Sequence, residues 1–76
     1  MGRIPVLRAT DVVRALEKLG FQTVRQRSSH IRMRNPGQRV VTVPVHSGRD
    51  IGRGLLRKIL RDAEVTTQEF LTAIRE

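Results

Sequence analysis

The chain has 76 residues and no cysteine, so its core is small and no disulfide can strengthen it. Fifteen lysines and arginines against seven acids give a formal net charge of +8. This balance points to a nucleic-acid partner, whereas an aromatic content of only 3% disfavours a base-stacking platform. Without cysteines or closely spaced histidines, we expect neither a metal site nor a cofactor. No apolar run suits a signal peptide or a membrane span, so we expect one cytoplasmic domain, residues 1–76.

The first half of the chain predicts a helix and then strands. Residues 1–9 are expected to be an extended lead-in, with Thr10 as the N-cap of a helix over residues 11–19 that stops at Gly20. Alternating patterns predict strands over residues 21–27, 30–35 and 39–43, separated by turns at residues 28–29 and 35–38 and ended by Pro44.

The second half predicts two helices. Asp50 is expected to cap the second helix or a short turn before it, and the buried stripe of this helix comprises Ile51, Leu55, Leu56, Ile59, Leu60 and Ala63. Residues 66–69 have the form of a capping box, which predicts a third helix over residues 67–75 that buries Phe70, Leu71 and Ile74. The order α-β-β-β-α, with a short extra C-terminal helix, predicts an α+β fold. In it, helices cover one face of a three-stranded antiparallel sheet, as in double-stranded-RNA-binding domains.

Residues 25–34 combine a histidine with arginines and lie in an acid-free span from Lys18 to Arg49. Strand alternation sends Ile31 and Met33 to one face and His30 to the other. An imidazole exchanges a proton near neutral pH, and guanidinium groups bind phosphate oxygens. The segment therefore predicts chemistry on a phosphodiester. His30 is the candidate catalytic residue, and the candidate RNA-binding residues are Arg25, Arg27, Arg32 and Arg34.

Each candidate also has a plainer interpretation. His30 could be a solvated strand residue that only helps to bind phosphate. Ser29 could orient His30 or bind the substrate, or it could simply form the turn. His46 follows the third strand and could serve as a general acid, or it could anchor the start of the second helix.

Several segments, at this order and spacing, also carry a resemblance: Leu19-Gly20-Phe21, residues 25–30, residues 41–46, residues 54–60 and Glu69-Phe70-Leu71. Over nearly its whole length the chain resembles the HicA-type toxins of bacterial type II toxin–antitoxin systems. The resemblance implies a double-stranded-RNA-binding-like fold and metal-independent cleavage of mRNA by the histidine of a Gly-Ser-His motif, which is His30 here. It also implies a HicB-type antitoxin that covers the site, with the toxin a monomer when free and part of a hetero-oligomer when bound.

Two positions depart from the family pattern: Ser28 stands where the motif has glycine, and Glu64 stands where glycine usually follows the second helix. If the family's glycine has a positive φ at the first position, Ser28 is strained there and the turn shifts, whereas Glu64 only puts the end of the second helix in doubt. The function expected from the resemblance is an endoribonuclease in which His30 deprotonates the 2′-hydroxyl of RNA. The alternatives are a non-catalytic double-stranded-RNA-binding module and, less favoured, a basic adaptor for an acidic protein.

Overall fold

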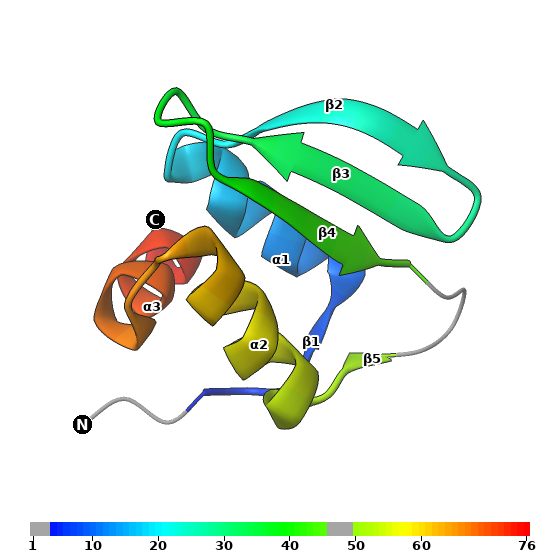
Figure 1. Ribbon diagram of the computed structural model, residues 1–76. Helices are drawn as coiled ribbons and strands as arrows, with labels where there is room; N and C mark the ends of the chain where they lie inside the picture. The colour runs from blue at the N-terminus through cyan, green and yellow to red at the C-terminus, as the bar shows by residue number, and fades with distance from the viewer. Residues whose placement is uncertain (1–3, 46–49) are drawn as a thin grey trace.

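The protein is described here from a computed structural model that covers residues 4–45 and 50–76. Its described elements are β1 (Leu7–Arg8), α1 (Ala9–Lys18), β2 (Gln22–Arg27), β3 (His30–Arg34), β4 (Val40–Pro44), β5 (Asp50–Ile51), α2 (Arg53–Ala63) and α3 (Thr67–Arg75). Strands β2, β3 and β4 form an antiparallel sheet in that order, and β1 pairs with β5. Figure 1 shows the helices on one side of the larger sheet. The predicted α+β fold of the double-stranded-RNA-binding type is confirmed.

The hydrophobic core lies between this sheet and the helices. The largest fully buried side chains come from both layers: Phe21, Phe70, Leu16, Met33, Leu56, Val12 and Val43. Burying each large apolar side chain stabilises the fold by about 1.5–3 kcal/mol before the entropy of ordering is subtracted. Helix α3 is fixed by Phe70 in this core and by Lys18, whose Nζ donates to the carbonyl of Ala73 at 3.1 Å. The core therefore depends on one face of the sheet only.

Helices α1 and α2 end in the same way, with hydrogen bonds from the two residues after the helix back into its last turn. After α1, the N–H of Gly20 donates to Glu17 and that of Phe21 to Leu16. After α2, the N–H of Glu64 donates to Arg61 and that of Val65 to Leu60. This Schellman pattern requires a positive φ, which is 101° at Gly20 and 56° at Glu64. Helix α2 thus ends at Ala63 with Glu64 as its cap, and the structure adds that Glu64 has the positive φ that favours glycine.

The start of each of the first two helices was predicted wrongly. Helix α1 begins at Ala9 with Arg8 as its N-cap, so Thr10 lies in the first turn. The Asp11 carboxylate accepts from the N–H of Arg8 at 3.3 Å, which is the contact that the N3 side chain makes with the cap backbone in a capping box. Asp50 does not cap α2, because it pairs with Arg8 in the β1–β5 ladder and Gly52 takes the cap position.

The predicted buried stripes also need correction at a few positions. Leu55 is 39% exposed, because the apolar stripe of a helix that begins at Arg53 starts one residue later, at Leu56. Ile51 is buried as predicted, but from strand β5. In α3, Phe70 is buried as predicted, whereas Leu71 and Ile74 are only half-buried.

Candidate active site on the open sheet face

The sheet face turned away from the helices, the open face, gathers almost all the predicted site residues. Because directly paired residues of an antiparallel sheet project to the same side, the register defines its rows. The rows, from one end of the sheet to the other, are Arg27–His30–Pro44, Arg25–Arg32–Thr42 and Gln22–Arg34–Val40. His30 and the four predicted RNA-binding arginines are all exposed. The structure thus brings these five side chains onto one surface.

Strand β2 contributes two of these arginines because of an irregularity at Val24. Thr23 pairs with Met33 and Arg25 with Arg32, so Val24 is an extra residue in the ladder, a β-bulge. Thr23 and Arg25 lie two apart in sequence, yet Thr23 faces the helices and Arg25 the open face. If Val24 instead took a regular paired position opposite Arg32, Arg25 and Arg27 would point to the helix side, since unbroken alternation places them with Thr23. The bulge therefore determines which face is basic.

The open face places two like charges directly opposite one another, because Arg25 is the cross-strand partner of Arg32. Such a pair is destabilising in a sheet. The ion pairs found among the described residues are Arg39–Glu64 and Lys58–Asp62, and neither involves an arginine of this face. A cluster of unpaired guanidinium groups is suited to an external anion.

Local hydrogen bonds hold His30 at the end of the β2–β3 hairpin. The Oγ of Ser29 lies 3.0 Å from Nδ1 of His30, so a hydrogen bond joins the two side chains. The backbone is also fixed, because the N–H of Val45 donates to the carbonyl of Ser29 at 2.8 Å. When Nδ1 carries the proton and donates to Ser29, Nε2 is left as the free base directed away from that contact. Ser29 therefore contacts the residue that sequence reasoning linked it to.

The turn that precedes His30 accepts serine without strain. The non-glycine residues with positive φ among those described are Gln38 and Glu64, so Ser28 has a negative φ. The replacement of glycine by Ser28 thus does not force the left-handed conformation. His46, the other histidine considered at the sequence level, lies outside the described residues.

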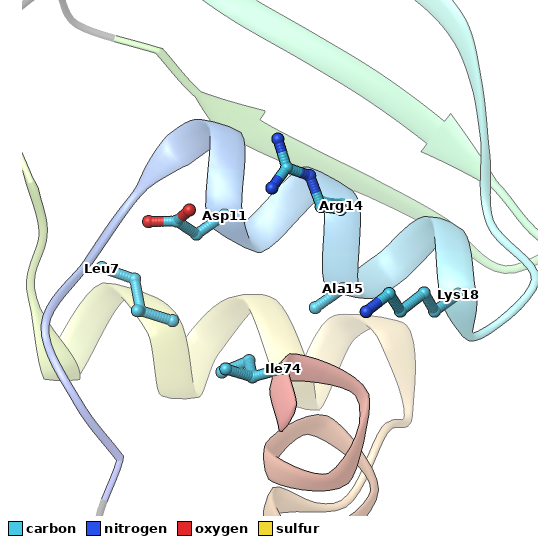
Figure 2. A pocket seen from close by; sticks show the side chains of 6 residues that line it. All are labelled: Leu7, Asp11, Arg14, Ala15, Lys18 and Ile74. Atoms are coloured by element: carbon cyan, nitrogen blue, oxygen red, sulfur yellow. The ribbon is translucent and has the colours of Figure 1, made fainter. Parts of the chain in front are cut away.

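One hollow lies among the helices and away from the open face. Figure 2 shows a cavity of about 280 Å³ between β1, α1 and α3, lined by Leu7, Asp11, Arg14, Ala15, Lys18 and Ile74. In residues 4–45 and 50–76, no three His, Cys, Asp or Glu side chains are grouped as a metal site would need. Over the same residues, no helix is long and apolar enough to cross a membrane.

Fold and face together define a small α+β domain of the double-stranded-RNA-binding type, with an exposed histidine set among arginines. A family model described as the HicA toxin of bacterial toxin–antitoxin matches residues 9–65, from the start of α1 to just after α2. The chain therefore belongs to the HicA toxin family, the toxins of toxin–antitoxin systems, and the resemblance seen in its sequence is confirmed. A comparison with curated proteins finds no match.

Proposed function

We propose that this toxin is an endoribonuclease that cuts mRNA with His30 as its catalytic residue, and that a HicB-type antitoxin neutralises it by covering the open face. The observation that carries the proposal is the position of His30, exposed in the same row as Arg27 and one row from Arg25 and Arg32. A phosphate held by these arginines lies beside the imidazole, which is the geometry that proton transfer requires. The cytoplasm, where mRNA is translated, is the proposed place of action.

The proposed reaction uses the RNA's own nucleophile. Nε2 of His30 takes the proton of a 2′-hydroxyl, and the 2′-oxygen attacks the adjacent phosphorus. The bond from phosphorus to the 5′-oxygen breaks, which leaves a 2′,3′-cyclic phosphate and a 5′-hydroxyl. The arginines of the open face stabilise the charge that develops on the phosphate oxygens. The leaving oxygen gains its proton from His46 or from solvent.

Ser29 has a positioning role in this scheme. Its hydroxyl accepts from Nδ1–H while Nε2 is the base, and it can turn to donate when the ring needs the other tautomer. Oriented imidazoles depend on such a partner for the correct nitrogen to face the substrate. Ser29→Ala should therefore slow cleavage at saturating RNA with little change in RNA affinity.

The test is cleavage of a single-stranded transcript in the presence of EDTA. The wild-type chain should yield products ending in a cyclic phosphate, and a 2′-deoxy substitution at the cleaved nucleotide should block the cut. Removing a general base typically costs about 10²–10⁴-fold in rate, so His30→Ala should be almost inactive while still binding RNA. Arg75→Ala, at an exposed position on α3, is the matched control and should cut normally.

The competing function is a non-catalytic RNA-binding module, which the same experiment distinguishes. It is favoured by one observation: among the residues that the structure describes, Ser29 is the one side chain seen hydrogen-bonded to His30, and it is neither acid nor base near neutral pH. Salt-dependent RNA binding without any cut product, in wild type and His30→Ala alike, would establish the module and overturn the nuclease.

A further inference from the structure

Strand β2 is one of the two edges of the three-stranded sheet, and β4 is the other. The neighbour of β2 is β3, and the opposite side of β2 pairs with no other described strand. All six residues from Gln22 to Arg27 are exposed. An edge strand presents main-chain N–H and C=O groups that can pair with another chain, and proteins usually protect such edges with proline, charged side chains, a β-bulge or a cover. Strand β2 has no proline and no cover from the described elements; its protection is limited to the bulge at Val24 and to the charges of Arg25 and Arg27, which an acidic strand would neutralise.

The helix side of β2 is also uncovered. Thr23 and Gln26 point to that side, as partners of Met33 and Ile31, yet both are exposed. The helices pack mainly against β4, at the other edge of the sheet. Figure 1 shows the β2–β3 hairpin extending beyond the helices at its turn. An added strand would therefore find its main-chain partners accessible along β2.

The side chains of this edge specify the chemistry of the added strand. Arg25 and Arg27 stand two residues apart on the open side of β2, so acidic side chains at the same spacing on a neighbouring strand would lie beside them. At the bulge, Val24 is 47% exposed and lines a hollow of about 240 Å³ with Gly20 and Pro36 on its apolar side and Gln22, Arg34 and Asn35 on its polar side. A side chain at the matching end of the added strand that is apolar against Val24 would cover this exposed valine.

We propose that the β2 edge is a docking site for an extended, acidic segment of a protein partner, which adds to the sheet as a fourth strand. Main-chain hydrogen bonds supply affinity, and carboxylates beside Arg25 and Arg27 supply specificity. Because Arg27 shares a row with His30, such a strand also narrows access to the candidate base. That the partner is the antitoxin rests on the proposed function. The exposed β2 edge is a property of the fold and does not depend on it.

The probe is a capped peptide as long as β2 in which glutamate and valine alternate, added to the ¹⁵N-labelled full chain. Binding should slow hydrogen exchange at the outward-facing amides of β2. The matched control is the same peptide N-methylated at alternate residues, which keeps its charge and side chains but removes main-chain donors. The N-methylated peptide should bind the chain about tenfold more weakly than the unmodified peptide. Equal binding of the two peptides, or protection confined to α2 or β4, would overturn the proposal.

Charge variants give an independent test. Arg25→Glu combined with Arg27→Glu should weaken binding about five- to tenfold or more, and Arg57→Glu on α2 should leave it unchanged. A short RNA should shift the NMR signals of Arg32 and Arg34 without slowing hydrogen exchange at the amides of β2. That result supports the β2 edge as a site for protein rather than RNA. An RNA that protects the β2 amides as the peptide does would overturn that assignment. His30→Ala separates the two proposals, since the variant should lose cleavage and still bind the peptide.

Discussion

The two faces of the β2–β3–β4 sheet differ in how their side chains affect stability. On the helix side, Met33, Val41 and Val43 are at most 3% exposed and pack into the core. On the open side, arginine faces arginine across the strands, which is unfavourable for folding. One face therefore stabilises the domain, and the other carries charges that stability alone does not explain. Local arrangements that cost stability are typical of functional sites.

Several cations elsewhere in the described chain have partners within the fold, while others, such as Arg57 and Arg75, form no ion pair or side-chain hydrogen bond among the described residues. Arg39 pairs with Glu64, and Lys58 pairs with Asp62 one helical turn away. Arg53 donates through Nε to the carbonyl of Ile4 at 2.8 Å. Arg39, Lys58 and Arg53 have partners within the fold, whereas the arginines of the open face are available to bind an external anion.

The largest effect is expected on the helix side. Met33→Ala should lower the free energy of unfolding by about 2–5 kcal/mol, because a fully buried side chain is replaced by a cavity. Urea denaturation followed by circular dichroism measures the change. Arg34→Ala, at the next position of the same strand but on the open face, should change stability by less than about 0.5 kcal/mol. Similar losses in both variants would contradict the division between the faces.

On the open face, a substitution should act in opposite directions on stability and on binding. Arg32→Thr relieves the repulsion from Arg25 and places threonine beside Thr42, so stability should rise by about 0.2–1 kcal/mol. Arg32→Thr should also weaken RNA binding, which is measured in a His30→Ala background that cannot cut RNA. The slope of log affinity against log salt should become less steep by about 0.7 for single-stranded RNA. Arg75→Ala in the same background should keep the slope. Should Arg32→Thr destabilise the fold, the cost assigned to the facing arginines is wrong.

An effect of similar size is expected at the end of α2, on the helix side of the molecule. Glu64→Gly should raise stability by about 0.5–1 kcal/mol, since relief of the positive φ outweighs the loss of an exposed ion pair with Arg39. Glu64→Gln keeps the backbone requirement and removes only the charge, so it should not raise stability. Thermal unfolding of the two variants compares them, and a gain from glutamine equal to that from glycine would show that backbone strain is not the cause.

Most of the fold could be predicted from the sequence because its signals are local. The Asn35–Gln38 turn, the capping box before α3 and the alternation of β3 each act within a few residues. The errors arose where tertiary contacts decide. Asp50 is a strand residue because Arg8, far away in sequence, pairs with it. No local pattern distinguishes such a two-residue strand from a helix cap.

The candidate site could be predicted only in part. His30 and Arg32 follow from clean alternation on β3, but the alternation of residues 21–27 is irregular, and the cause is the bulge at Val24. A bulge is decided by pairing with the next strand, so the sequence of β2 alone did not reveal that Arg25 and Arg27 share the face of His30. The four arginines were named from charge and resemblance; the register shows their common surface.

The smallest effect is the pH dependence of the helix side. The N–H and hydroxyl of Thr66 bond with Glu69 and hold the pKa of its carboxyl below the ordinary value. A carboxylate with a lowered folded pKa stabilises the native state above its unfolded pKa, and this contribution is lost as the pH falls through the folded value. Glu69→Gln should therefore reduce the stability lost between neutral and acidic pH, as measured by urea denaturation at several pH values. The open face has no acid in its rows, so Arg34→Ala should leave that dependence unchanged. A change in acid sensitivity with Arg34→Ala would mean that the two faces are electrostatically coupled, and the separation drawn between them would fail.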